Sequence, residues 1–339
     1  MKRWTVILVA IAQLAVLLVM AGEREWIARA GTPIVLRTAP IDPRDPMRGD
    51  YVRLEYEISM VPRALCSDRL ESWFEDGARV RDRKVYAALR VADDGLAELA
   101  GLSDEPPDDG LFLRGRAEHV SFDNLRVRYG VEAFFMQQGR ARALEDEMRG
   151  ARRGSLLNMT ARVNSRGAVV LQDYEWEPLG ITLRFERAAE RPDDPRRWRE
   201  LIAIDIELKN HGDAPIAIVD RPRAGSFRLA RNLRRHSQAF SWVGEGDPMP
   251  AAKPEDVRLI APGETHVTRI DLADPRWFVI PEDDGEPVSL SSLRDAWDVS
   301  LRFEYTPPAP GEIVRLPHAE MMQHRVLRSA AFSPAGGVD

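Results

Sequence analysis

An unbroken apolar run near the N-terminus constrains this chain more than any other feature of its sequence. The run extends from Trp4 to Ala21, follows the basic residues Lys2 and Arg3, and ends at a charged segment, residues 23–25. As an α-helix with a rise of about 1.5 Å per residue, it is about 27 Å long, close to the hydrocarbon thickness of a bilayer. Because positive charges stay on the cytoplasmic side, we expect a transmembrane helix whose C-terminal body is exported.

The apolar run has two possible fates. In one, Val19 and Ala21 occupy the −3 and −1 positions of a signal-peptidase site, and the run is removed. In the other it stays as an anchor, because it exceeds the usual apolar length of a signal peptide, about 7–15 residues. Residues 23–30 also continue its helical pattern, and no other stretch is comparably long and apolar. We favour an uncleaved, single-pass anchor over residues 1–30, which holds the body in the periplasm at a bacterial inner membrane.

Charge and cysteine content disfavour several classes of protein. The formal net charge is -6 and the sequence pI is about 5.7, whereas a nucleic-acid-binding surface is basic, so we expect no nucleic acid partner. The single cysteine, Cys66, has no disulfide partner within the chain. The six histidines form no pair with metal-ligand spacing. The sequence contains no phosphate-binding loop, dinucleotide fingerprint or Gly-x-Ser-x-Gly motif. We therefore expect no metal and no cofactor, and we assign no catalytic residue.

From Gly31 onward the hydrophobic pattern has a period of two, which predicts β-strands. Alternating or apolar segments predict strands at residues 52–58, 85–91, 96–99, 111–120, 127–135, 157–163 and 168–176. The segments 93–95 (Asp-Asp-Gly) and 164–167 (Asn-Ser-Arg-Gly) are typical of hairpin turns. A helical pattern from Ala141 to Met148 interrupts the series. Residues 31–178 therefore predict one antiparallel β domain with a short inserted helix.

A second β unit is expected over residues 181–310. Its strand patterns at residues 202–209, 216–219, 267–272 and 299–305 are separated by turns rather than by long helices. This spacing resembles an immunoglobulin-like β-sandwich, although the cysteine pair of antibody domains is absent. The Pro-rich residues 311–339 predict a partly disordered tail. The predicted fold class is thus mainly β: a transmembrane helix, an antiparallel β domain and a β-sandwich.

One short motif is specific. Residues 49–56 read Gly-Asp-Tyr-Val-Arg-Leu-Glu-Tyr. Its defining positions are Gly49, Asp50, Tyr51, Leu54 and Tyr56. They match, at every specified position, the pattern after which the GDYXXLXY family is named, so the chain resembles that family. The preceding segment, which contains Asp42, Arg44 and Arg48, is similar to the family's lead-in.

A second block resembles another signature of the same family. It contains Tyr129, Glu132, Phe134 and Phe135. The family usually continues with an acidic residue before a glycine, whereas this chain has Gln138 at that position. The resemblance covers residues 25–178 and implies a membrane-anchored bacterial protein, often encoded beside multi-spanning membrane proteins. It implies no reaction and no cofactor, so the expected partners are membrane lipid and a multi-spanning membrane protein.

The first motif has a structural and a functional interpretation, and both stay open. Prolines in residues 42–46 predict a rigid turn, and Gly49 is expected to adopt a backbone conformation that other residues avoid. The Asp50 carboxylate would then accept hydrogen bonds from turn amides or pair with Arg44 or Arg48. We expect Glu132 to meet an arginine of the same loop. The motif is either a tight loop that starts a strand or a patch for binding or catalysis.

Three functions are compatible with the sequence. The favoured one is a periplasmic accessory or interaction protein, without an assigned biochemical activity, that acts with an integral membrane partner. The second is an envelope hydrolase that uses carboxylates of the set Asp42, Asp50 and Glu132, since paired acids can perform acid–base chemistry when burial shifts one pKa. The third is a small-ligand or glycan-binding module, which requires a concave pocket.

Overall fold

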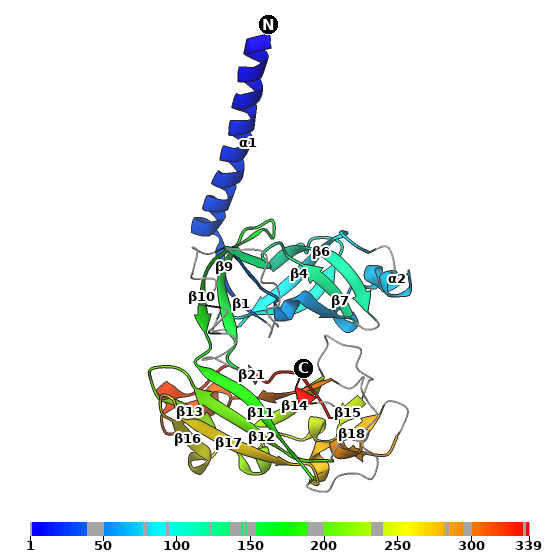
Figure 1. The fold of residues 1–339 in the computed structure, drawn as a ribbon, viewed down its shortest axis with the longest axis vertical. Helices are drawn as coiled ribbons and strands as arrows, with labels where there is room; N and C mark the ends of the chain where they lie inside the picture. Colours follow the sequence, from blue (N-terminus) through cyan, green and yellow to red (C-terminus); the bar gives the residue numbers. More distant parts are fainter. Residues whose placement is uncertain are drawn as a thin grey trace. The chain divides into compact units, whose positions relative to one another are not determined.

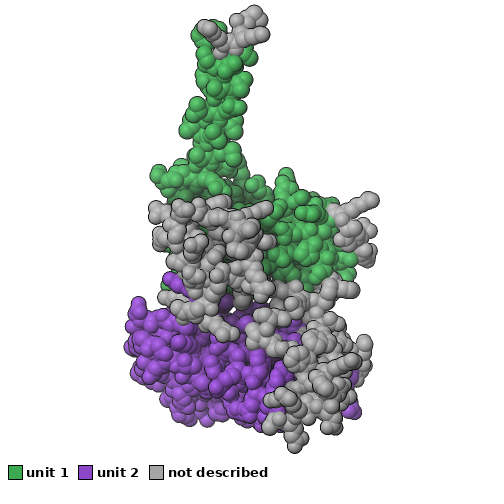
Figure 2. All heavy atoms as spheres, viewed as in Figure 1, with its two compact units in different colours: residues 1–142, 157–176 green, residues 143–156, 177–339 purple. Residues whose placement is uncertain are grey.

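The chain is mainly β, with one long helix at its N-terminus, as predicted. The computed structural model describes residues 2–38, 51–76, 80–92, 95–121, 124–135, 144, 147, 154–188, 200–231, 240–281, 285–293, 300–334 and 337–338. Two compact units, coloured separately in Figure 2, are present: residues 1–142 with 157–176 form unit 1, and residues 143–156 with 177–339 form unit 2.

Among its described residues, unit 1 contains two α-helices and ten strands, several of which are labelled in Figure 1. The helices are α1 (Lys2–Ala30) and α2 (Asp68–Asp76). The strands are β1 (Thr32–Arg37), β2 (Tyr51–Arg53), β3 (Met60–Pro62), β4 (Lys84–Val91), β5 (Ala97–Ser103), β6 (Leu111–Ser121), β7 (Asn124–Arg128), β8 (Ala133–Phe135), β9 (Leu157–Val163) and β10 (Val169–Trp176). They form sheets in the orders β3-β7-β6-β4-β5 and β1-β9-β10, and a separate pair, β2-β8. All strand pairs within these sheets are antiparallel.

Alternation of apolar and polar residues builds the core of unit 1. Val85 and Ala87 of β4 are fully buried, as are Leu113 and Ala117 of β6, while the side chains of Tyr86, Arg114 and Arg116 are more exposed. The predicted hairpin turn at residues 164–167 is present: the Asn164 side chain accepts hydrogen bonds from the backbone amides of Arg166 and Ala168. The period-two pattern therefore located most strands correctly.

The predicted strand at residues 52–58 is shorter than expected. Pairing with β8 ends at Arg53, and Tyr56 then forms an isolated bridge with Thr38 instead. Residues Glu57–Ser59 form a 3₁₀ turn. The chain thus changes its pairing partner within three residues, so the segment cannot form one continuous strand. Leu54 and Tyr56 are nevertheless buried, as the alternation predicted.

The predicted strand at residues 127–135 is interrupted. Gly130 has a φ of +81°, in the left-handed region, and the Glu132 side chain accepts hydrogen bonds from two nearby backbone amides. Such local side-chain bonds compete with a continuous ladder, so the segment splits into β7 and β8. Of the helix expected at Ala141 to Met148, only residues 144 and 147 are described, and both are helical, as predicted. Helix α2 is a further helix within residues 31–178 that the sequence pattern did not predict.

Helix α1 continues beyond the apolar run and ends on the β-sheet. It contacts β9 and β10, and Ile27, near its end, is only 3% exposed. The Arg162 guanidinium donates to the Gly31 carbonyl at 2.9 Å, and the Gln172 side-chain amide donates to the Ala28 carbonyl at 2.8 Å. Since β1 begins at Thr32, Gly31 alone separates helix from strand.

Unit 2 consists of short strands. They are β11 (Leu179–Arg187), β12 (Leu201–Asn210), β13 (Ile216–Val219), β14 (Phe227–Arg231), β15 (Phe240–Trp242), β16 (Val257–Ile260), β17 (Thr265–Asp271), β18 (Phe278–Pro281), β19 (Val288–Ser289), β20 (Leu301–Tyr305), β21 (Leu327–Arg328), β22 (Phe332–Ser333) and β23 (Gly337–Val338). The sheets have the orders β11-β12-β17, β13-β16, β15-β18-β19 and β14-β20-β22-β23, with β21 paired to β20. A short helix, α4 (Pro310–Ile313), follows β20.

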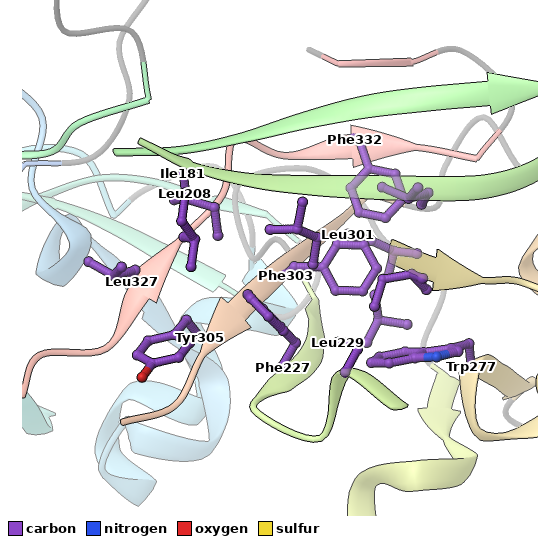
Figure 3. Packing of buried hydrophobic residues seen from close by; sticks show 14 of the residues in the cluster. Ile181, Leu208, Phe227, Leu229, Trp277, Leu301, Phe303, Tyr305, Leu327 and Phe332 are labelled. Carbon is purple, nitrogen blue, oxygen red and sulfur yellow. The ribbon is translucent and has the colours of Figure 1, made fainter. Parts of the chain in front are cut away.

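Sheets of unit 2 share one core, which is compatible with the expected sandwich. Ile181 and Leu208, from the β11-β12-β17 sheet, belong to the same buried cluster as Leu301, Phe303 and Tyr305 of β20 (Figure 3). The Phe303 ring lies 5.6 Å from the Trp277 ring in an edge arrangement and 5.5 Å from the Phe332 ring in a stacked one. Aromatic pairs of this kind add about 0.5–1.5 kcal/mol each beyond burial.

Part of the Pro-rich tail is built into unit 2. Residues 311–334 are described as ordered chain, and Leu327 and Phe332 are buried in the core of unit 2. Leu327 pairs with Tyr305 through β21, and Phe332 pairs with Leu301 through β22. Two widely spaced apolar residues of the Pro-rich tail thus belong to strands that pair with β20.

Candidate functional site

The two family-like sequence blocks meet in one antiparallel ladder. β2 pairs with β8 so that Tyr51 lies opposite Phe135, Val52 opposite Phe134, and Arg53 opposite Ala133. The ladder then continues by one further hydrogen bond, since the Leu54 amide donates to the Glu132 carbonyl at 2.7 Å. Blocks that are far apart in the sequence therefore form a single structure, which we call the signature pair: residues 51–59 together with residues 129–135.

Two buried tyrosines tie the halves of the signature pair together. The Tyr56 hydroxyl donates to the Val131 carbonyl at 2.7 Å, and the Tyr129 hydroxyl donates to the Ile58 carbonyl at 2.8 Å. Tyr56 is fully buried and Tyr129 nearly so. The two bonds run in opposite directions between the blocks, so each block supplies one tyrosine donor and one carbonyl acceptor. Buried hydroxyls need such partners, because an unsatisfied polar group in the core costs about 1–3 kcal/mol.

Burial also changes the acidity of these phenols. It raises the pKa of Tyr56 and that of Tyr129 well above the ordinary value for tyrosine, and the negative charge of Glu132 raises the pKa of each further. Both hydroxyls are therefore neutral hydrogen-bond donors throughout the physiological pH range. This protonation state suits a structural bond to a backbone carbonyl rather than proton transfer.

Glu132 caps a turn within the second block. One carboxylate oxygen accepts a hydrogen bond from the Tyr129 amide, and the other accepts one from the Gly130 amide at 2.9 Å. Gly130 adopts the left-handed conformation that this turn requires, which glycine reaches without steric cost. The carboxylate thus holds the backbone that presents the Tyr129 hydroxyl and the Val131 carbonyl to the first block.

Aromatic contacts extend the signature pair towards β10. The Phe134 ring packs edge-on against the Tyr174 ring, with centroids 6.1 Å apart. Leu54 is buried in the core of unit 1. Thr38 bridges Tyr56, and its hydroxyl donates to the Leu157 carbonyl at 2.8 Å, which links the pair to the β1-β9-β10 sheet.

The loop before the first block lies outside the described residues. This applies to Asp42, Arg44, Arg48, Gly49 and Asp50. The side chains of Tyr51 and Phe135 are likewise not described, although their backbone pairing is. The expected contact between Glu132 and an arginine of this loop therefore stays a prediction. Among the residues that are described, no group of three or more His, Cys, Asp or Glu side chains is placed to hold a metal ion.

Sequence reasoning named the tyrosines but missed their acceptors. The carbonyls of Ile58 and Val131 belong to residues whose side chains give no hint of a polar role. Thr38 was missed as well, since it stands outside both blocks. The available signal was the pairing of two tyrosine-containing motifs, since a tyrosine next to buried aliphatic residues needs an acceptor from elsewhere in the chain.

Part of the chain, including this site, matches one known protein family. The model of a protein family described as GDYXXLXY protein matches residues 13–173. The match begins within α1 and ends in β10, and it therefore includes the whole signature pair. No curated protein and no solved structure matches the chain.

Proposed function

Because residues 13–173 belong to the GDYXXLXY family, we propose that this protein is a membrane-anchored accessory protein that acts with an integral membrane partner. In this proposal α1 stays in the inner membrane of a bacterium, and units 1 and 2 are in the periplasm. The partner is a multi-spanning membrane protein, and the chain itself catalyses no reaction. The observation that carries the proposal is the way α1 ends on unit 1.

Docking of α1 leaves little distance between the bilayer and the β-strands. Ile27, which is buried, follows the last apolar residue, Ala21, by six positions, or about 9 Å of helix. A headgroup layer is about 5–8 Å thick on each side of the hydrocarbon. Unit 1 therefore begins at the outer edge of the headgroups, where it can contact the extramembrane surface of a neighbouring membrane protein.

The ends of α1 support retention in the membrane. Trp4 and Trp26 are 76% and 72% exposed and flank the apolar residues. They are 22 positions apart, or about 33 Å along the helix, which places both indole rings near the two interfaces, where tryptophan is enriched. The helix is long and apolar enough to cross a membrane, and none of its apolar window is buried in the structure. Lys2 and Arg3 favour a cytoplasmic N-terminus.

The envelope-hydrolase alternative has less support from the described residues. Both carboxylate oxygens of Glu132 already accept backbone hydrogen bonds, and the nearby Tyr56 and Tyr129 hydroxyls are bound to carbonyls. A general acid or base needs a carboxyl oxygen directed at a substrate within hydrogen-bond reach, whereas both oxygens of Glu132 are directed at backbone amides. The signature pair instead uses its polar atoms to hold two chain segments together.

Site-specific photo-crosslinking in living cells tests the proposed partnership. A photoreactive residue replaces Leu17 in the apolar run or Trp26 at its end, since both side chains are exposed. The matched control carries the same residue at Val314 of unit 2, which is 80% exposed. We expect a discrete adduct with a multi-spanning membrane protein from position 17 or 26 and none from position 314. Adducts with lipid alone at both test positions would contradict the proposal.

A further inference from the structure

A polar pocket lies on unit 1, outside the signature pair. It has a volume of about 410 Å³ and is lined by Arg81, Asp82, Glu118, His119 and Arg128. Its size is within the usual range for small-molecule sites, about 300–1,000 Å³. Every lining side chain is charged or carries a ring N–H, which suits a small polar ligand rather than an apolar one.

An irregularity in β6 builds one wall of the pocket. Adjacent residues of a regular strand point to opposite faces, yet Glu118 and His119 both line the pocket. The pairing of β6 with β7 shifts register between Ala117 and His119, so Glu118 is the extra residue of a β-bulge. Bulges re-aim side chains in this way and are common beside binding sites.

Ion pairs connect several of the charged side chains that line the pocket. The Arg128 guanidinium lies 3.2 Å from the Asp82 carboxylate and 4.0 Å from that of Glu118. Arg126 pairs with the other oxygen of Glu118 at 3.0 Å, and Arg116 donates to the Asp82 carbonyl at 2.6 Å. The two carboxylates and the Arg128 side chain are therefore fixed before any ligand arrives, which lowers the entropic cost of binding.

Two cationic or donor groups are left for a ligand. Among the described residues, the side chains of Arg81 and His119 form no hydrogen bond or ion pair, although both line the pocket. The lining carboxylates already pair with Arg126 and Arg128, so the unpaired Arg81 guanidinium makes the pocket favour an anion. Guanidinium groups bind phosphate oxygens through paired N–H donors, and the Asp82 and Glu118 carboxylates accept bonds from hydroxyl groups.

We propose that this pocket binds a polyol phosphate, a phosphate ester that also carries free hydroxyl groups. Arg81 and Arg128 hold the phosphate, His119 donates a further hydrogen bond to it, and Asp82 and Glu118 accept hydrogen bonds from the hydroxyls. The same chemistry occurs in soluble sugar or glycerol phosphates and in the headgroup of phosphatidylglycerol. This binding activity is additional to the partnership proposed above and does not depend on it.

Calorimetric titration of the full-length chain in nanodiscs tests the proposal. Glycerol 3-phosphate is titrated into protein held in phosphatidylcholine nanodiscs, and the titration is repeated with phosphatidylglycerol in the discs. Arg81→Ala and Arg128→Ala remove the phosphate donors, and Arg81→Ala touches no described partner, so the fold is kept. The matched control, Arg90→Ala, removes an exposed arginine of β4 that is paired with Glu98 instead.

The expected result is saturable binding that Arg81→Ala and Arg128→Ala weaken by at least about tenfold and that Arg90→Ala leaves unchanged. If phosphatidylglycerol in the discs competes with glycerol 3-phosphate and weakens its binding, the occupant is the lipid headgroup. If phosphatidylglycerol has no effect on that binding, the occupant is a soluble phosphate ester. Both results support the proposal. Absence of saturable binding in phosphatidylcholine discs, or equal binding by the wild type and Arg81→Ala, would overturn it.

Discussion

The hydroxyl of Tyr56 donates a hydrogen bond to the backbone carbonyl of Val131 at 2.7 Å, although 75 positions separate the two residues. A second bond, from Tyr129 to the Ile58 carbonyl, connects the same two segments in the opposite sense. The family's two sequence blocks are therefore halves of one structural element. The two tyrosine hydroxyls and their carbonyl acceptors form hydrogen bonds within this element, so the described part of the motif stabilises unit 1.

Replacement of Tyr56 by phenylalanine should therefore destabilise unit 1. Tyr56→Phe keeps the ring and leaves the buried Val131 carbonyl without its donor, which costs about 1–3 kcal/mol. Tyr174→Phe is the matched control, since its half-buried hydroxyl has no hydrogen-bond partner among the described residues, and a change within about 0.5 kcal/mol is expected there. Urea unfolding of the two variants measures the difference. Equal midpoints would show that the Tyr56 bond contributes nothing.

The two carboxylate oxygens of Glu132 should stabilise the fold of unit 1 through the hydrogen bonds that they accept. Glu132→Gln replaces one acceptor by an N–H donor that faces a backbone amide, and it removes the charge from the other bond. Hydrogen bonds to charged groups contribute about 1.5–3 kcal/mol, so a loss of about that size is predicted. Glu98→Gln, at an exposed surface ion pair, should change the unfolding free energy by less than about 1 kcal/mol. A larger effect from Glu98→Gln than from Glu132→Gln would refute this role.

The buried tyrosines should make the folding stability of the chain depend on pH in the alkaline range. Burial raises the pKa of Tyr305 to about 12 and raises the pKa values of Tyr56 and Tyr129 as well. The unfolded chain releases these protons near pH 10, before the folded chain does, so stability is complete below about pH 10 and falls above it. Each such tyrosine costs about 1.4 kcal/mol per pH unit until its folded pKa is reached.

Tyrosinate absorbance and circular dichroism, followed together from pH 8 to pH 13, check this dependence. Of the six tyrosines, the three buried ones should ionise late and together with the loss of structure. Tyr305→Phe should make the fall in stability between pH 10 and pH 12 shallower. Ionisation of all six near pH 10, with the fold intact, is the outcome that this account forbids.

The junction between α1 and β1 should not tolerate a side chain. A Cβ added at Gly31 would lie 2.6 Å from the Ile27 carbonyl oxygen and 3.0 Å from the Val163 carbonyl oxygen. Gly31→Ala should therefore displace the helix end at a cost of about 1–3 kcal/mol and make residues 22–31 more sensitive to proteolysis. Gly22→Ala is the control, because a Cβ there meets no atom within 4 Å. Identical cleavage rates for both variants would argue against a docked helix end.

Sequence reasoning recovered what depends on local periodicity. The long apolar N-terminal helix, most strands of both units and the burial of Leu54 and Tyr56 follow from spacing that is visible in the chain. It failed where contacts over long sequence distances decide the outcome. The segment around Tyr56 changes its partner from β8 to Thr38, and Phe332 in the tail pairs with Leu301 of β20. Neither contact produces a periodic pattern of hydrophobic residues in the sequence.

At the candidate site, too, the sequence identified some features and missed others. The residues of the signature pair were identified from the motif, but the polar contacts made by Glu132 were not, because its partners are backbone amides one turn away. The polar pocket was missed altogether: Glu118 and His119 lie together only because a bulge breaks the alternation of β6. A period-two pattern assigns such neighbours to opposite faces.

The proposed function requires that α1 is retained and holds the two β units on the outer side of the membrane. The most direct measurement is the intact mass of the chain extracted from membranes, combined with protease treatment of spheroplasts that carry a C-terminal tag. The account predicts a mass that includes the apolar run up to Ala21 and a tag that protease removes without lysis. A chain that starts at Gly22, or a tag that is digested only after lysis, would contradict it.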